Sequence, residues 1–211
     1  MHFEADHLYH LYNRGNNSQK IFYNRENYLF FLKKIKLYVL PYADILAWVL
    51  MPNHFHIMVY VKAVSVNVEP EVFNTERLTL SEPLSIKNLQ PKVRTFNNAL
   101  GIMLRTYARA IQKQEKMTGS LFQEHTKASC LTKPDVKDFN WYYEDYELQN
   151  NYVLNQLDYP TVCFGYIHEN PVKSALCPSN VDWEFSSAPD YFANRKGKLI
   201  NKAKAKEYGL Y

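Results

Sequence analysis

Two histidines separated by one residue could bind a metal ion together. His54 and His56 flank Phe55 at the start of an apolar segment, residues 54–61, which has the composition of a β-strand. Side chains two positions apart on a strand point to the same face, so both imidazoles can reach one ion while Phe55 faces the opposite side. A hydrogen-bonded, half-buried pair that binds no metal has the same spacing, so the pair alone does not define a metal site.

A tyrosine and an asparagine four positions apart form a second candidate. Tyr166 and Asn170 share one face of an expected helix that begins near Pro160, a residue suited to the first helical turn. The helix should end near Asn170, because Pro171 disfavours helical geometry in the residue before it. In a chain with 17 tyrosines, Tyr166 alone is more typical of a packing residue than of a catalytic one, and Asn170 alone is typical of a helix terminator.

The elements that position these residues alternate between strands and helices. Strands are expected over residues 7–13, 44–50 and 54–61 and within 119–129, and helices over residues 25–39, 92–114 and 160–170. A Met-Pro-Asn turn at residues 51–53 joins the second and third strands in an antiparallel hairpin. This order predicts an α+β fold, in which helices pack on an antiparallel sheet.

Composition limits the classes of function. The 211 residues suit a single domain, residues 1–211, and a hydrophobic content of 46% excludes a wholly disordered chain. The three cysteines form no CxxC pair, which predicts a reduced protein. The sequence shows no signal-peptide pattern and no apolar run long enough to cross a membrane, which predicts a cytoplasmic protein with no membrane segment. The net charge of +4 permits a nucleic-acid partner without requiring one.

Several short blocks, in their order along the chain, resemble the REP-associated tyrosine transposases. These proteins are insertion-sequence-type transposases of the single-tyrosine HUH superfamily, named for a His-hydrophobe-His motif. The blocks are residues 9–16 (YHLYNRGN), 51–59 (MPNHFHIMV), 119–123 (GSLFQ), 166–173 (YIHENPVK) and 183–187 (WEFSS). Each block is weak by itself, and their combination makes the match specific.

The resemblance implies a ferredoxin-like antiparallel sheet, the HUH endonuclease and transposase fold, and it gives the candidate residues their roles. His54, His56 and Asn170 would ligate a divalent metal ion, Mg²⁺ or Mn²⁺, and Tyr166 would be the nucleophile. Imidazole ligands suit transition metals better than magnesium, which favours manganese of the two. The implied activity is that of a transposase that nicks and joins single-stranded DNA near hairpins through a 5′-phosphotyrosine intermediate.

Neighbouring residues compete for these roles. His168 could be another ligand or proton carrier, but it lies two positions from Tyr166 and therefore off its helical face. Tyr152 and Tyr159 could be alternative nucleophiles, but Tyr152 is far from the Asn-Pro signature and Tyr159 precedes the expected helix.

Basic residues at the end of the first strand and on the second helix are candidate contacts for single-stranded or hairpin DNA. The strand end offers a guanidinium and backbone amides to phosphate, and the basic helix could line the path of the strand. Any one of these charges is more typical of a solvated side chain, and only the group favours DNA binding. The candidates are Arg14, Gly15, Asn16, Lys20, Arg105 and Arg109.

Two stretches are longer than the compact pattern of these transposases. They are residues 65–91 and residues 132–159, and the second includes an acidic, aromatic segment whose acids we expect to face away from DNA phosphates. A basic polar tail is expected from about residue 195. The second stretch leaves open whether Tyr166 meets the histidines of its own chain or those of a partner in a homodimer.

Two other functions stay open on the sequence alone. One is a domesticated relative that binds hairpin DNA without cleavage. The other is a metal-dependent phosphodiesterase that uses water in place of Tyr166 as the nucleophile.

Overall fold

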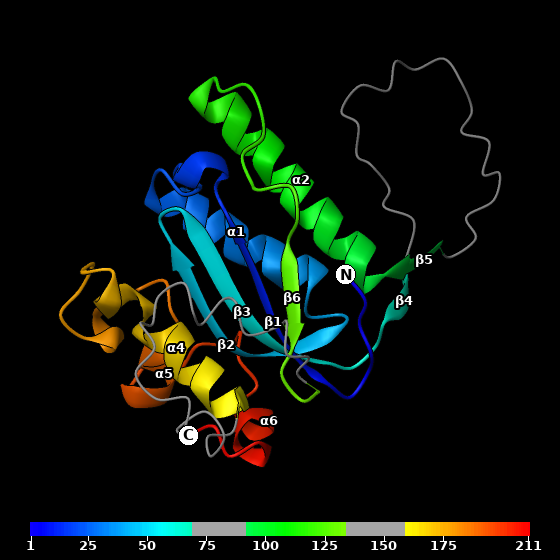
Figure 1. The fold of residues 1–211 in the computed structure, drawn as a ribbon, viewed down its shortest axis with the longest axis vertical. Coiled ribbons are helices and arrows are strands. Elements are labelled where there is room, and N and C mark those ends of the chain that lie inside the picture. The colour runs from blue at the N-terminus through cyan, green and yellow to red at the C-terminus, as the bar shows by residue number, and fades with distance from the viewer. Residues whose placement is uncertain (69–91, 134–158) are drawn as a thin grey trace, which may run out of the picture.

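The computed structural model describes residues 1–68, 92–133 and 159–211. Its centre is a four-stranded antiparallel sheet with the order β2-β3-β1-β6 (Figure 1). The strands are β1 (Leu8–Arg14), β2 (Ala43–Met51), β3 (His54–Val61) and β6 (Lys127–Cys130). Helix α1 (Arg25–Tyr38) follows β1 and helix α2 (Phe96–Glu115) follows β3. This order of elements is the ferredoxin-like arrangement, and it confirms the predicted α+β fold.

The two faces of the sheet carry different helices. Helices α1 and α2 cover one face, while α4 (Tyr159–Lys173), α5 (Ala188–Phe192) and α6 (Lys202–Glu207) lie on the other side (Figure 1). Phe55 packs in the core on the α1 side, where its ring centroid is 5.1 Å from that of Phe31. Met58 packs in a separate core with residues of α4. The predicted alternation of β3 is therefore confirmed.

The second helix begins later than the sequence predicted. Residues 92–95 were expected to be helical, but Lys92–Thr95 forms strand β5, which pairs antiparallel with β4 (Ser65–Val68). The side-chain oxygen of Thr95 then accepts a hydrogen bond from the backbone amide of Asn98 at 3.2 Å. This N-cap fixes the start of α2 at Phe96, and the apolar periodicity of the segment does not reveal it.

Helix α4 continues past the proline that was expected to end it. Pro171 lies inside the helix, which runs to Lys173, and the amide of Ser174 still donates to the carbonyl of Asn170 at 3.0 Å. A proline in a helix supplies no amide to the carbonyl four residues earlier, but here the following turn keeps its own hydrogen bonds. The helix is consequently intact on both sides of Asn170.

The C-terminal segment is folded onto the sheet and is not a free tail. The Trp183 indole donates to the carbonyl of Leu50 at 3.0 Å, and Ser186 forms an antiparallel bridge with Val49 of β2. This segment covers part of the β2 edge, which would otherwise expose unpaired backbone groups. Two short 3-10 helices, η1 (Asn16–Ser18) and η3 (Asn180–Asp182), complete the described elements.

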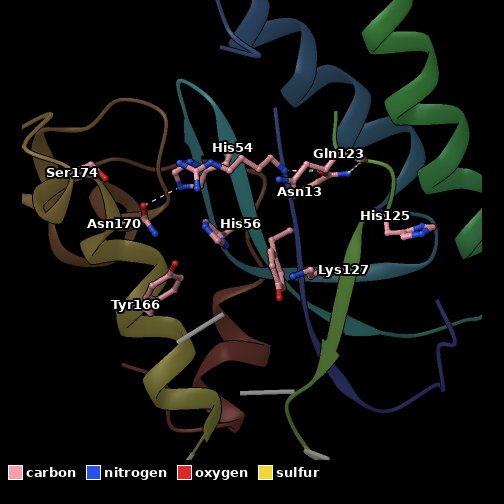
Figure 2. Close-up of a pocket in the computed structure, with 11 residues that line it drawn as sticks. Asn13, His54, His56, Gln123, His125, Lys127, Tyr166, Asn170 and Ser174 are labelled. Atoms are coloured by element: carbon pink, nitrogen blue, oxygen red, sulfur yellow. Dashed lines mark hydrogen bonds between the residues drawn. The ribbon is translucent and has the colours of Figure 1, made fainter. Parts of the chain in front are cut away.

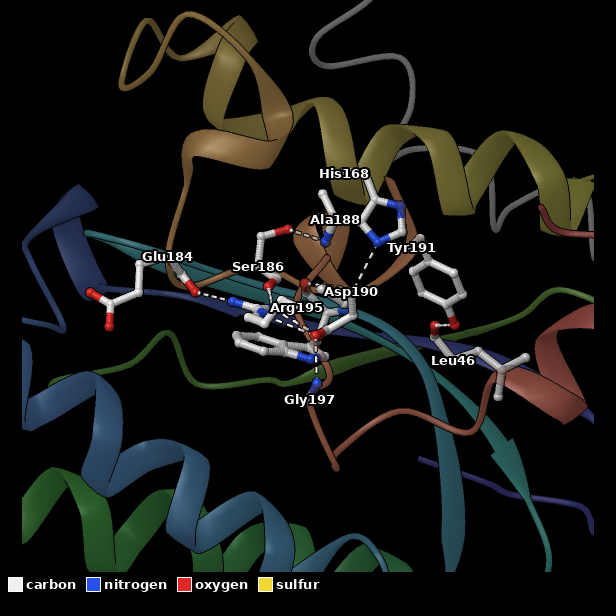
Figure 3. Close-up of polar contacts among 11 residues, drawn as sticks. Leu46, His168, Glu184, Ser186, Ala188, Asp190, Tyr191, Arg195 and Gly197 are labelled. Carbon is white, nitrogen blue, oxygen red and sulfur yellow. Dashed lines mark hydrogen bonds and ion pairs between the residues drawn. The ribbon is translucent and has the colours of Figure 1, made fainter. Parts of the chain in front are cut away.

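An ion pair between the buried Asp190 and the partly exposed Arg195 holds the start of the predicted tail (Figure 3). The Asp190 carboxylate accepts from Arg195 at 2.8 Å and from the backbone amide of Gly197 at 2.8 Å, and Arg195 also donates to the carbonyl of Glu184. Further along, α6 buries Ala205 against the α4-side core. Residues from about 195 are therefore part of the packed domain.

Some sequence predictions fall beyond these elements. Residues 69–91 and 134–158, which include most of both predicted insertions and Tyr152, lie outside the described residues. Within the described ranges, no helix is long and apolar enough to cross a membrane. The three cysteines all lie in the described ranges and form no disulfide.

The turn after β1 leaves no room for a side chain at Gly15. A Cβ atom there would lie 2.0 Å from the carbonyl oxygen of Gln19, which belongs to the backbone and cannot swing away. We expect Gly15→Ala to lower the free energy of unfolding by about 3 kcal/mol, the upper end of the usual overpacking penalty. Urea unfolding followed by circular dichroism measures this change.

Gly101→Ala is the matched control for this experiment. Gly101 lies in α2 with nothing nearer to a new Cβ than a flexible arginine atom at 4.0 Å. Because alanine is the better helix former, this variant should gain up to about 1 kcal/mol. Equal effects of the two substitutions would contradict the steric explanation.

Candidate active site

A pocket of about 430 Å³ opens between the sheet and α4 (Figure 2). Strands β1, β3 and β6 supply one wall and α4 supplies the other. The pocket contains all four of the residues for which metal binding or catalysis was predicted. Its lining residues are Tyr12, Asn13, Arg14, His54, His56, Gln123, His125, Lys127, Tyr166, Asn170 and Ser174.

His54 lies between two amide side chains. Its Nδ1 atom is 2.6 Å from Oδ1 of Asn53, and the Asn53 amide nitrogen donates to the carbonyl of Ser18, which orients that oxygen toward the ring. Nδ1 is therefore the protonated nitrogen of a neutral His54. The Nε2 lone pair then faces Oδ1 of Asn170 at 3.2 Å. The Nε2 lone pair and the Oδ1 atom repel each other at this distance, so a cation or a proton between them is favourable.

His56 lines the pocket, is almost fully buried, and has a third histidine as its partner. Its Nδ1 atom is 2.9 Å from Nε2 of His10, which is fully buried on β1. Burial is the main cause that holds the pKa of His56 well below its usual value, and the nearby His10, His54 and Arg14 lower this pKa further by charge repulsion. Burial also lowers the pKa of His10 to about 3. Both rings are neutral at physiological pH, so the histidines keep lone pairs that could bind a metal ion.

Tyr166 approaches these histidines from α4 of the same chain. Its ring meets His56 edge to face, with 5.3 Å between the ring centroids. Tyr166 and Asn170 both line the pocket from one face of the helix, one turn apart (Figure 2). The phenol and the imidazoles thus meet within a single chain, which was left open by the sequence.

His168 points away from this pocket. Its Nε2 atom lies 2.7 Å from the hydroxyl of Ser187, and that hydroxyl also bridges to both backbone groups of Trp48. The Ser187 proton goes to the Trp48 carbonyl, so Nε2 of His168 donates. Burial is the main cause that lowers the pKa of His168 to about 3, with Asp190 acting weakly in the opposite direction. The prediction that His168 lies off the Tyr166 face is confirmed. The prediction that Tyr159 precedes the helix is wrong, because Tyr159 is the first residue of α4.

The predicted DNA contacts separate into two groups. Arg14 lines the pocket, and Lys20 is exposed beyond the nearby turn. The backbone amides of Gly15 and Asn16 do not face a ligand, because they donate to the carbonyls of Asn53 and Leu121 at 2.7 and 2.9 Å. These amides are therefore already paired within the protein, and contact of Gly15 and Asn16 with DNA stays a prediction.

Two of the predicted contacts lie on the far face of the sheet. Arg105 and Arg109 are exposed on α2, which covers the face opposite α4 (Figure 1). The sheet separates them from the histidine pair. They do not line the pocket, so their predicted contact with DNA stays open only for parts of a DNA molecule that lie outside it.

Other pocket residues were missed from the sequence. Tyr12 is paired with His56 on one side and with Lys127 on the other, so these three side chains form one row across the sheet. The Lys127 ammonium lies 5.7 Å from the centre of the Tyr12 ring. The alternation of His10, Tyr12 and Arg14 along β1 is the signal that places them on one face. The strand that carries Lys127 gives no comparable signal.

The donor set fits a divalent ion that retains open coordination positions. Two neutral imidazoles and one amide oxygen supply no charge, and transition metals accept such nitrogen and oxygen ligands. Among the described residues no group of three or more His, Cys, Asp or Glu could hold a metal ion. Any ion held here would therefore depend on Asn170 and on ligands from the substrate or water.

The sheet order and the helix on its histidine face are consistent with the fold of HUH transposases. No profile of a known protein family matches the chain, and no curated protein matches it. A solved structure of a REP-associated tyrosine transposase bound to a REP hairpin is similar to it, with a TM-score of 0.50 and 13% sequence identity. The likeness covers 95% of this chain and 92% of that one, and at this identity it shows the shared fold.

The burial of His168 predicts a specific loss of stability in acid. Its folded pKa of about 3 lies below the usual value of 6.5, so the unfolded chain binds the proton more readily. The contribution of neutral His168 to the free energy of unfolding is complete above pH 6.5. It falls by about 1.4 kcal/mol per pH unit as the pH drops toward 3. His168→Gln should show a correspondingly shallower loss between pH 6 and pH 4 in urea unfolding experiments.

His125→Gln provides the comparison for this measurement. The His125 side chain is 84% exposed, so its replacement should leave the pH dependence as it is in the wild type. If His168→Gln and the wild type lose stability with the same slope, burial of a neutral His168 is not the cause.

Proposed function

We propose that this protein is a metal-dependent tyrosine transposase that nicks and joins single-stranded DNA at hairpin-associated sites. The observation that carries the proposal is the meeting of Tyr166 and Asn170 with His54 and His56 in one pocket of one chain. The fold shared with a transposase that was solved with a REP hairpin supports hairpin DNA as the partner. The sequence blocks quoted above support the same class of reaction.

Tyr166 would be the nucleophile of the proposed reaction. Its phenol oxygen attacks the scissile phosphorus, the new P–O bond to tyrosine forms, and the P–O3′ bond breaks. The phenol proton is released and the departing 3′ oxygen takes up a proton, so the products are a 5′-phosphotyrosine and a 3′-hydroxyl. Attack by another 3′-hydroxyl reverses the step and joins strands without a nucleotide cofactor.

His54, His56 and Asn170 would hold the divalent ion. When bound, such an ion polarises a phosphate oxygen and helps to orient the scissile group. The buried position of Tyr166, which is 6% exposed, restricts the phenol to the pocket side of α4. The chain itself thus contributes positioning, which lowers the entropic cost of attack.

Residues on the β1 and β6 side of the pocket would hold the DNA strand. Arg14 and Lys127 bring positive charge to the lining, and Tyr12 presents an aromatic ring beside His56. Cations that neutralise phosphate next to an aromatic surface for a base are typical of single-strand binding.

A covalent-trapping experiment tests the nucleophile. Purified protein with Mn²⁺ and a 3′-labelled hairpin oligonucleotide should give a labelled protein–DNA adduct on a denaturing gel. The same oligonucleotide labelled at its 5′ end should give only a shorter free fragment, because the adduct carries the 3′ fragment. Tyr166→Phe removes the attacking oxygen and should abolish the adduct and the cleavage. Tyr159→Phe, a change to another tyrosine of the same helix, should retain both.

The alternative functions give different results in this assay. Hairpin binding by the wild type without an adduct in any divalent metal would identify a binding protein. Cleavage that survives Tyr166→Phe would identify water as the nucleophile. Either result would reject the proposed function.

The positions of the arginines predict which of them contributes to binding of single-stranded DNA. In a Tyr166→Phe background, Arg14→Gln should weaken binding of a short single-stranded oligonucleotide and reduce its salt slope by about 0.7, the value for one lost phosphate contact. The double variant Arg105→Gln, Arg109→Gln should change neither quantity, because α2 lies across the sheet from the pocket. Fluorescence anisotropy at several salt concentrations measures both, and a larger effect of the double variant would place the strand on the α2 side.

A further inference from the structure

His10 is a buried histidine that does not line the pocket but touches a residue that does. It lies on β1 with 0% exposure, and its Nε2 atom is 2.9 Å from Nδ1 of His56. The two ring planes are 23° apart and their centroids are 5.0 Å apart, so the rings meet edge to edge through these two nitrogens. The Tyr12 ring packs against both imidazoles, with its centroid 4.8 Å from that of His10 and 5.7 Å from that of His56. Packing therefore fixes both imidazoles in plane and in position.

A hydrogen bond between two imidazole nitrogens requires one N–H group and one lone pair. If Nε2 of His10 carries the proton, then Nδ1 of a neutral His56 is the acceptor and its Nε2 atom is protonated. In that state His56 has no lone pair to offer toward the pocket. If Nδ1 of His56 carries the proton, His10 accepts it and Nε2 of His56 is free to be a ligand.

We propose that His10 is a positioning residue that accepts the Nδ1 proton of His56 and so presents the Nε2 lone pair of His56 to a divalent ion. This inference rests on the proposed function only in its assignment of His56 as a metal ligand. Histidine ligands in general donate their second nitrogen to an acceptor that fixes the tautomer and the ring orientation. Such acceptors are usually carboxylates, carbonyls or water, and here the acceptor is an uncharged imidazole.

The corresponding partner of His54 supports this assignment. Asn53 accepts from Nδ1 of His54, just as His10 would accept from Nδ1 of His56. Both histidines of the pair would then direct Nε2 into the same pocket. Both outer partners are neutral, so the charge of a bound ion is not reduced by groups behind the ligands.

Metal binding by two variants of His10 tests the proposal without measuring DNA cleavage. Co²⁺ is a suitable probe because imidazole sites bind it more tightly than Mn²⁺ and it absorbs visible light when bound. His10→Phe keeps an aromatic ring but offers no acceptor, and it should weaken Co²⁺ binding about 10- to 100-fold. His10→Gln restores an acceptor oxygen and should bind Co²⁺ within a few fold of the wild type.

The tautomer of His56 gives a second readout that needs no variant of His10. Long-range ¹H–¹⁵N spectra of the metal-free wild type, with the His56 signals assigned from His56→Gln, should show a protonated Nδ1 and an unprotonated Nε2. A protonated Nε2 in His56 would overturn the proposal. Co²⁺ affinity that is equal in His10→Phe and the wild type, with both folded by circular dichroism, would also overturn it, as would a wild type that binds no Co²⁺.

The two proposals fail in different ways. If Co²⁺ binding depends on His10 but Tyr166 forms no adduct with DNA, the proposed transposase function fails and the role of His10 stands. If the adduct forms and His10→Phe leaves metal affinity unchanged, the function stands and the role of His10 fails.

Discussion

The alternation of side chains on β3 is the constraint on which the site depends. Phe55, Ile57 and Val59 are at most 2% exposed in the core between the sheet and the α1–α2 layer. Their burial forces His54 and His56 to the opposite face, since a shift of one residue would move every side chain of the strand to the other side. Strand β3 is paired along its length with β1 and with β2, so this register is held from both edges.

Helix α4 reaches the histidines because its side away from the pocket is held by β2 and by the C-terminal segment. Cys163, Phe164 and Ile167 pack into the core above β2, while His168 is bonded to Ser187, which in turn is bonded to the backbone of Trp48. The helix is therefore attached to the same strand by apolar packing and by a polar bridge. Because Tyr166 and Asn170 lie on the opposite side of α4 from His168, fixing one side of the helix aims the other at the pocket.

The sequence was sufficient for features that depend on local periodicity and insufficient for those that depend on packing. The spacing of His54 and His56, and of Tyr166 and Asn170, gave their shared faces, and the order of elements gave the α+β fold. The extension of α4 beyond Pro171 and the delayed start of α2 depend on hydrogen bonds and strand pairing that no spacing encodes. Arg105 and Arg109 were grouped with Arg14 because all are basic, and only the sheet between them shows that they face different sides.

The charge around the pocket agrees better with a site for a phosphate and an ion together than with a site for an ion alone. Among the described residues that line it, none is acidic, while Arg14 and Lys127 contribute positive charge. A cation held only by neutral imidazoles and an amide, beside two basic side chains, gains little electrostatic attraction from the protein. A DNA phosphate would supply the missing negative charge and would contact both the ion and the two basic side chains. Under the proposed function, binding of the ion and binding of the DNA strand therefore strengthen each other. Because no carboxylate lines the described part of the pocket, the ion keeps its full charge to act on the phosphate.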